Sequence, residues 1–243
     1  MATLRGDERL PRYQRVADQL RQEIADGVRR PGDRMPSENL LADQYALAPG
    51  TIRQAVTQLV SEGVLERFQG KGTFVRRPSF DQSLFRFFRF LGRPGERVVP
   101  EGRILGREAK PAPEYVSLRL ELDQNAPAIC LSRLRLLRKQ PVLLEEIWLS
   151  KEDFMPILEI DEKKLGPLLY PIYDELCGRT VANAEEELTV EAADHQTAQT
   201  LQIAEGDPVI VIERLAKGFD GSPLEWRRSV GRADQFRYQI EIR

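Results

Sequence analysis

Histidine and cysteine are scarce in this chain of 243 residues, and their scarcity removes several kinds of site. The single histidine, His195, has no second imidazole with which to form a multi-histidine metal centre, and any Ser-His-Asp or Cys-His site would have to use it. It lies in EAADHQTAQTL, whose helical spacing favours an exposed helix position. The two cysteines, Cys130 and Cys177, belong to no CxxC pattern, which predicts buried free thiols and no disulfide framework or zinc site. We expect no cofactor, no metal and no catalytic residue.

Long apolar runs are also absent. No stretch approaches the roughly 20 residues that cross a bilayer, so no membrane partner is expected. The first ten residues, MATLRGDERL, lack the apolar core of a signal peptide, which predicts a cytoplasmic protein. The 41% hydrophobic and 30% charged residues are typical of a soluble globular chain, long enough for two domains.

The charge is distributed unevenly. Residues 1–77 contain 13 Lys and Arg against 10 Asp and Glu, whereas the remainder contains 23 against 28. A mildly basic N-terminal part on an acidic body fits a DNA-binding head attached to a domain that does not bind DNA.

Residues 36–76 are the most informative stretch. An amphipathic helix is predicted before this stretch, over 13–26. Within the stretch, Ser37 can cap a second helix that buries Leu40, Leu41 and Tyr45. After a break at Ala48-Pro49-Gly50, a third helix is predicted from about Thr51 to Glu62. Two short strands, 64–68 and 73–75, then flank Gln69-Gly70-Lys71-Gly72. This order is typical of a winged helix-turn-helix, which places one helix in the DNA major groove.

Candidate DNA-reading side chains lie on the third helix and the wing. Arg53 can pair with guanine and Gln54 with adenine. The hydroxyls of Ser37, Thr51 and Thr73 suit phosphates, and Lys71 at the glycine loop can enter a minor groove or contact the backbone. An ordinary helical bundle with a solvated charged face is the alternative.

The rest of the chain mixes strands and helices. Short turns such as Arg138–Pro141 and Phe219–Ser222 join consecutive strands, which predicts an antiparallel α+β domain. Strands are predicted at 102–108, 129–137, 142–149, 184–190, 209–216, 224–230 and 238–242, and helices at 165–177 and 194–201. The strand register around Arg138–Pro141, and therefore the face that carries a pocket, stays open.

Two arginines stand out in this second part. Arg133 and Arg135 are two apart on a strand and therefore project to one face, among apolar neighbours. Burying two guanidiniums requires anionic partners. Those partners are either Glu145 and Glu225, as an internal network, or a phosphate or carboxylate ligand.

Residues 11–76 resemble the DNA-binding domain of the GntR superfamily of bacterial transcription regulators. The motifs are Met35-Pro36-Ser37-Glu38-Asn39, Thr-Ile-Arg-Gln-Ala at 51–55 and Gln-Gly-Lys-Gly-Thr-Phe-Val at 69–75. The resemblance implies DNA contacts at Ser37, Thr51, Arg53, Gly70, Lys71 and Thr73. Many members have Ser-Arg-Thr, with a base-contacting arginine, where this chain has Ala48-Pro49-Gly50, and arginine where Asn39 stands. Readout should therefore depend more on Arg53 and the wing.

Residues 84–243 resemble the UTRA effector domain of the HutC subfamily, whose fold is like that of chorismate lyase. The motifs include Arg133-x-Arg135, Pro141–Glu145, Leu169-Tyr170, Pro223–Trp226 and Arg232–Tyr238. In relatives that bind sugar phosphates, the positions that line the pocket correspond to Arg133, Arg135, Glu145, Tyr170 and Glu225. This chain has Leu168 where relatives often have serine, Gly231 where they have tyrosine, and Arg227 where they have serine. The extra arginine and the fewer hydroxyls favour a smaller or more acidic effector.

The resemblances imply three segments: a winged helix-turn-helix at 9–76, a linker at 77–83, and an effector-binding and dimerisation domain at 84–243. The aromatic run at 84–90 is either core packing or a hinge that senses the ligand. The predicted function is a metabolite-responsive repressor that binds an inverted-repeat operator as a homodimer and releases it on binding a small carboxylate or phosphate. The alternatives are a lyase-like enzyme with Glu145 or Glu225 as acid or base, and a DNA binder without effector control.

Overall fold

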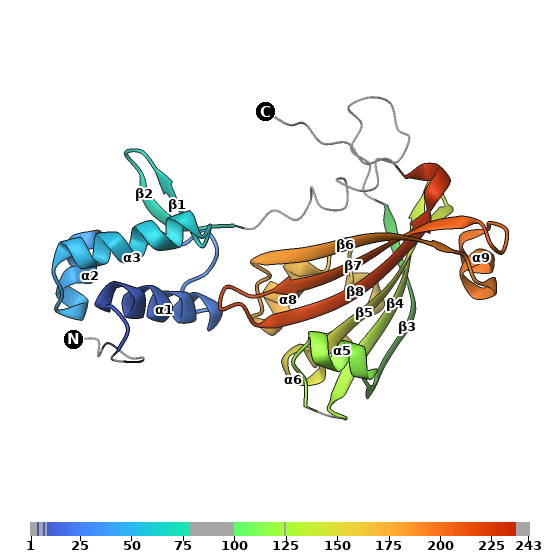
Figure 1. The fold of residues 1–243 in the computed structure, drawn as a ribbon, viewed down its shortest axis with the longest axis horizontal. Helices are drawn as coiled ribbons and strands as arrows, with labels where there is room; N and C mark the ends of the chain where they lie inside the picture. The colour runs from blue at the N-terminus through green and yellow to red at the C-terminus, as the bar shows by residue number, and fades with distance from the viewer. Residues whose placement is uncertain (1–3, 5–6, 8, 78–99, 124, 237–243) are drawn as a thin grey trace. The chain divides into compact units, whose positions relative to one another are not determined.

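The computed structural model describes residues 4, 7, 9–77, 100–123 and 125–236 (Figure 1). The chain forms two compact units, one built mainly from residues 1–78 and the other from 79–217 and 223–243. The predicted linker after Arg77, the aromatic run at 84–90 and the predicted strand at 238–242 lie outside the described residues. Among the described residues, no helix is long and apolar enough to cross a membrane.

Three helices form the core of the first unit: α1 (Arg12–Ala25), α2 (Glu38–Tyr45) and α3 (Pro49–Ser61). The Ser37 side chain caps α2 by accepting the Leu40 N–H at 3.2 Å, as predicted. Leu41 and Tyr45 are buried, but Leu40 is 49% exposed, so its predicted inward position was wrong. Residue 40 lies one helical step outside the buried stripe.

Helix α3 begins earlier than predicted. Ala48 is its N-cap and Pro49 its first residue, so Pro49-Gly50 opens the helix instead of separating two helices. Proline suits this position, because the first N–H of a helix has no intrahelical partner and the ring presets φ. The correction adds Pro49 and Gly50, about half a turn, to the N-terminal end of α3.

The wing is a hairpin of β1 (Leu65–Phe68) and β2 (Gly72–Val75), in which Phe68 pairs with Gly72. Gly70 and Gly72 have φ of 74° and 117°, a backbone region that side chains disfavour. A bridge between Arg34 and Phe74 attaches the segment before α2 to the outer side of the hairpin.

The second unit is built on one six-stranded antiparallel sheet, with the spatial order β3-β4-β5-β8-β7-β6. All six predicted strands within the described residues lie inside it. Its strands are β3 (Glu101–Pro111), β4 (Pro127–Leu137), β5 (Gln140–Ser150), β6 (Asn183–Ala192), β7 (Pro208–Lys217) and β8 (Pro223–Arg232). With the helical head and its small wing sheet, this makes the α+β fold that the sequence predicted.

Helices cover both faces of the sheet (Figure 1). One face packs on α6 (Lys151–Phe154), α7 (Pro156–Glu159) and α8 (Tyr170–Cys177) through a core that includes Ile129, Leu131 and Ile147. The side chains of the opposite face pack on α5 (Glu114–Arg119) and α9 (His195–Leu201). The helices α5, α6 and α7 were not predicted, because they have four to six residues and too little periodicity to be recognised.

The predicted helix over 165–177 is only half helical. A short 3₁₀ turn at Glu162–Lys164 precedes Leu165, and α8 starts at Tyr170. Gly166 and Pro167 interrupt the helical spacing, since proline disfavours helical backbone at the residue before it. The irregular segment 165–169 brings the Pro167 carbonyl over the sheet.

A two-residue turn resolves the open register between β4 and β5. Arg138 and Lys139 have φ of 49° and 67°, so Leu137 pairs with Gln140. This is the geometry of the tight hairpin turns that match strand twist. Together with a bulge after Arg135, the turn places Arg133 directly opposite Glu145.

Candidate DNA interface and buried arginine network

The exposed face of α3 is polar and follows helical spacing. Arg53 and Gln54, both predicted, are exposed there, and Thr57 and Ser61 continue the same face. With Tyr13, Gln14, Gly50 and Gln58 they line a shallow hollow of about 520 Å³ beside α1. The predicted set omitted Thr57 and Ser61, although their spacing of four and eight from Arg53 identifies them.

The other predicted DNA contacts lie around this helix and on the wing. Ser37 and Lys71 are exposed, and Thr51 and Thr73 are half-buried. The backbone N–H of Lys71 donates to the Phe68 carbonyl at 3.1 Å, which closes the hairpin at Gly70 and leaves the Lys71 side chain in solvent. These positions are compatible with phosphate contacts, because their hydroxyl and ammonium groups can donate to phosphate oxygens.

Glu38 joins the recognition helix to the wing. Its Oε2 accepts the Arg53 Nε–H at 2.9 Å, and its Oε1 accepts an Arg67 Nη2–H at 3.0 Å. Sequence reasoning named Glu38 only within the motif at 35–39 and did not include Arg67, since no pattern in the chain relates residues 38, 53 and 67.

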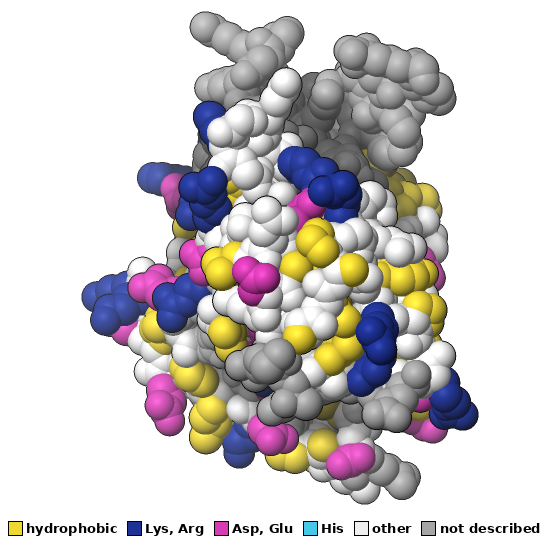
Figure 2. All heavy atoms as spheres, turned by 90° about the vertical axis from the view of Figure 1, so that its left-hand side faces the viewer, with side chains coloured by type: hydrophobic (Ala, Val, Ile, Leu, Met, Phe, Trp, Pro, Cys, Tyr) yellow, Lys and Arg dark blue, Asp and Glu magenta, His cyan; other side chains and the backbone are white. Residues whose placement is uncertain are grey.

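Charges of both signs occur in the view of the molecule drawn in Figure 2. Figure 2 shows dark blue Lys and Arg side chains spread over that view, many of them with magenta acidic side chains beside them. The ion pairs of Glu38 with Arg53 and Arg67 show the same mixture of charges beside α3. A surface of mixed charge binds DNA through individual contacts more than through a broad positive field.

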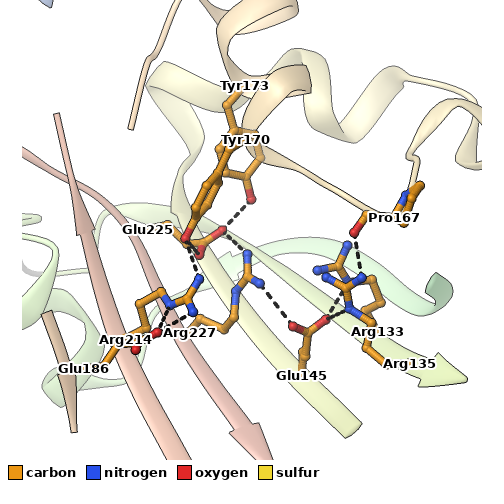
Figure 3. A network of polar contacts seen from close by, with 10 residues as sticks. All are labelled: Arg133, Arg135, Glu145, Pro167, Tyr170, Tyr173, Glu186, Arg214, Glu225 and Arg227. Atoms are coloured by element: carbon orange, nitrogen blue, oxygen red, sulfur yellow. Dashed lines mark hydrogen bonds and ion pairs between the residues drawn. The ribbon is translucent and has the colours of Figure 1, made fainter. Parts of the chain in front are cut away.

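A buried polar network lies on the sheet face that packs on α8 (Figure 3). Arg133 and Arg135 of β4 both donate from Nε to Glu145 Oε2 of β5, at 2.7 and 2.9 Å. Arg135 also donates from Nη1 to the Pro167 carbonyl at 2.6 Å. All three side chains are 1% exposed. Of the two alternatives left open for these arginines, the internal pairing with Glu145 is therefore present.

Arg227 of β8 connects Glu145 to the second predicted glutamate. It donates to Glu145 Oε1 at 3.1 Å and to Glu225 Oε2 at 2.7 Å. Glu225 also accepts the hydroxyls of Tyr170 and Tyr173, at 3.1 and 2.7 Å. The structure thus brings all six predicted effector residues together.

The network extends to two residues that were not predicted. Arg214 of β7 donates to the Tyr170 hydroxyl at 3.3 Å and from Nε to Glu186 of β6 at 2.6 Å. Arg214 is 8% exposed and lies opposite Arg227 in the β7–β8 register. A charged residue within the apolar run VIVIERLA was the available signal.

The network carries an excess of positive charge. Four guanidiniums, those of Arg133, Arg135, Arg214 and Arg227, face the three carboxylates of Glu145, Glu186 and Glu225. Arg133 Nη1 and Nη2 are buried and have no hydrogen-bond partner in the structure, and the same is true of Arg227 Nε. Buried donors of this kind are costly unless an acceptor meets them.

Electrostatics keep Arg135 and Glu145 charged. Burial lowers the pKa of Arg135 to about 10, which leaves its guanidinium protonated at neutral pH. Burial would raise the pKa of Glu145, but Arg133, Arg135 and Arg227 outweigh it and hold this pKa well below its ordinary value. One anionic group at Arg133 would therefore neutralise the cluster and satisfy its two unpaired nitrogens.

Comparisons with known proteins agree with both units. The model of the bacterial regulatory proteins of the gntR family matches residues 12–75, and the UTRA domain model matches residues 95–237. The mannosyl-D-glycerate transport/metabolism system repressor MngR of Escherichia coli is 25% identical over 233 residues, which cover 95% of each chain. The transcriptional repressor NagR of Bacillus subtilis is 28% identical over 94% of this chain and 93% of its own.

A solved structure shows the same fold. PhnF from Mycobacterium smegmatis has a TM-score of 0.55 at 22% identity and covers 93% of this chain and 96% of its own. The two curated relatives are named as repressors and not as enzymes. The chain therefore belongs to the GntR family of bacterial transcription regulators, in the HutC subfamily, with a helix-turn-helix head and a C-terminal UTRA domain.

Proposed function

We propose that the protein is a transcriptional repressor whose operator affinity is lowered by a small anionic metabolite. The observation that carries the effector half of the proposal is the pair of unpaired, buried Arg133 nitrogens in a network with one excess positive charge. The helix-turn-helix supplies the DNA-binding half.

The proposed effector is a carboxylate or a phosphate. Guanidinium donors in a fixed fork match the two oxygens of such a group, and burial strengthens the interaction. Arg135 and Glu145 lie beside Arg133, and the network continues beyond Glu145 through Arg227 and Glu225 to Tyr170. These residues would order the rest of the ligand. Because Arg227 already fills space between Glu145 and Glu225, the ligand is expected to be small.

The proposed regulatory mechanism is a population shift in a homodimer. Two copies would present two α3 helices to an inverted repeat. Effector would bind more tightly to a state in which the two heads no longer match the half-sites, and by linkage it would weaken DNA binding by the same factor.

The first test is to incubate the purified protein with fragmented genomic DNA at near-physiological salt and sequence the retained fragments. Enrichment of one inverted-repeat motif would support the proposal, and the adjacent genes would nominate candidate anions. Uniform retention that disappears with modest added salt would instead indicate a DNA binder without sequence preference.

The second test measures release from that operator by each nominated anion. An uncharged analogue of the same size serves as the control. Release by the anion and not by the analogue is expected. Equal operator affinity with and without a bound anion would contradict effector control.

A further inference from the structure

The Glu38 carboxylate is placed where it can govern DNA specificity without contacting DNA. It is the first residue of α2, it holds Arg53 on α3, and it holds Arg67 on β1 of the wing. Its side chain is 27% exposed, whereas those of Arg53 and Arg67 are 67% and 48% exposed. One partly covered acid thus connects two more exposed cations on separate elements.

The atoms used in these pairs leave donors for DNA. Glu38 accepts from Arg53 through Nε, so both terminal nitrogens of Arg53 remain for a bidentate contact with guanine. It accepts from Arg67 through Nη2, which leaves Arg67 three further nitrogen-bound hydrogens outside that group. The ion pairs therefore orient both side chains and do not use up their capacity for recognition.

The pairing has two physical consequences. A long arginine side chain loses conformational freedom when it binds, and an arginine that is already held loses less. The negative charge also reduces the attraction of this face to phosphates of any sequence. The first effect favours the correct operator, and the second disfavours all other DNA.

We infer that Glu38 is a positioning residue that sets DNA specificity by holding Arg53 and Arg67 together, and that Arg67 is a further DNA-contacting residue. This inference rests on the proposed DNA-binding function. It extends the predicted contact set from the helix and the wing tip to the strand between them.

The test compares Glu38→Gln with the wild-type protein on two duplexes of equal length, the enriched operator and a scrambled sequence, at several salt concentrations. The variant is expected to bind scrambled DNA more tightly. The slope of log affinity against log salt concentration should be steeper by about one. The ratio of operator to scrambled affinity should fall about tenfold, because one oriented base contact is loosened.

Glu62→Gln is the matched control. Glu62 pairs with Arg21 of α1 in the same unit, so the substitution removes one negative charge and one ion pair away from Arg53 and Arg67. Its operator-to-scrambled ratio should stay at the wild-type value. Thermal unfolding of both variants separates a folding defect from an effect on binding.

Several outcomes would overturn the inference. An unchanged ratio in Glu38→Gln, or the same change in Glu62→Gln, would remove the positioning role. A loss confined to one base position would show that Glu38 itself reads a base. In an Arg53→Ala background Glu38→Gln should have a much smaller effect, and a full effect there would contradict action through Arg53.

A wild-type ratio of operator to scrambled affinity near one would overturn the proposed function together with this inference. Failure of the variants alone leaves the proposed function standing.

Discussion

At the scale of single residues, the buried arginines are not equivalent. Arg133 shares Glu145 with two other guanidiniums and keeps two nitrogens unpaired, whereas Arg227 is the guanidinium paired with Glu225. The two arginines are similarly buried but have different roles. Arg133 has unpaired donors for a ligand, whereas Arg227 balances the negative charge of Glu225.

A pair of substitutions checks this difference. Arg133→Met should leave the free energy of unfolding within about 1 kcal/mol of wild type, because it removes the excess charge and its unpaired donors. Arg227→Met should lower it by about 3 kcal/mol or more, because Glu225 loses its charged partner in a buried site. Urea unfolding followed by circular dichroism measures both.

The same Arg133→Met variant should weaken operator release by an active anion about tenfold or more, with unchanged operator affinity in its absence. Undiminished release would separate Arg133 from the effector. A large loss of stability in Arg133→Met would contradict the charge count.

Glu145 makes a pH-dependent contribution to the free energy of unfolding. Its pKa in the folded protein is depressed by Arg133, Arg135 and Arg227, so its stabilising contribution is present above its pKa in the unfolded chain and is lost as pH falls below that value. Between about pH 4.5 and pH 3, the unfolded chain takes up a proton that the folded protein does not, which costs up to about 1.4 kcal/mol per pH unit.

Glu145→Gln should therefore show a shallower fall in the free energy of unfolding over this range than wild type. Urea titrations at successive pH values measure the slope. Glu175 lies at an exposed position of α8, so the free energy of unfolding of Glu175→Gln should fall with the same slope as that of wild type. Equal slopes for all three proteins would indicate that Glu145 is not ionised in the folded state below pH 4.5.

At the scale of elements, strand pairing explains how the network is assembled. Five adjacent strands, β4, β5, β8, β7 and β6, each contribute one or two charged side chains to the same face of the sheet. The turn at Arg138 and Lys139 matters because a slip of one residue in β4 would send both arginines to the opposite face.

This turn offers a test of its backbone. Lys139 has φ of 67°, a region that costs a residue with a Cβ roughly 1 kcal/mol relative to glycine. Lys139→Gly should therefore raise the free energy of unfolding by about 1 kcal/mol. Lys139→Ala removes the same charged group but keeps the Cβ, so it should give no such gain. If both variants behave alike, the strain at this turn is not what limits stability.

At the scale of the whole molecule, the proposed function requires two heads to act on one operator. Two DNA-binding units in a homodimer bind tightly only when both half-sites lie on the same side of the duplex. Five inserted base pairs rotate one half-site by roughly half a turn, whereas ten restore its side.

Adding five base pairs between the half-sites should thus reduce affinity at least about tenfold, because the second head can no longer bind together with the first. Adding ten should recover part of that loss. Gel-shift titrations on the three duplexes provide the measurement. Equal affinity for all of them would indicate that one head binds alone, and the homodimer would have to be abandoned.

The sequence alone was enough to determine the long helices, the strands and the family. The spacing of apolar residues located α1 and α2, and strand-like runs joined by short turns located six strands, because both signals are local. The motifs at 35–39, 51–55 and 69–75 identified the head, and the order of short motifs identified the UTRA domain. Local spacing could not locate the short helices, and Pro49 was misread because proline both ends helices and starts them.

Only the tertiary structure decided which charged groups meet. The alternatives for Arg133 and Arg135, internal carboxylates or a ligand, could not be separated from the sequence. The structure shows that Glu145 pairs with both arginines, that Glu225 pairs with Arg227 instead, and that Arg133 still keeps two unpaired nitrogens. Likewise, Arg214 joined the network and Glu38 joined Arg53 to Arg67 through contacts between residues 15 to 44 positions apart. The physical reason is that the energy of a buried charge depends on its neighbours in space, and chain spacing specifies those neighbours only within one helix or one hairpin.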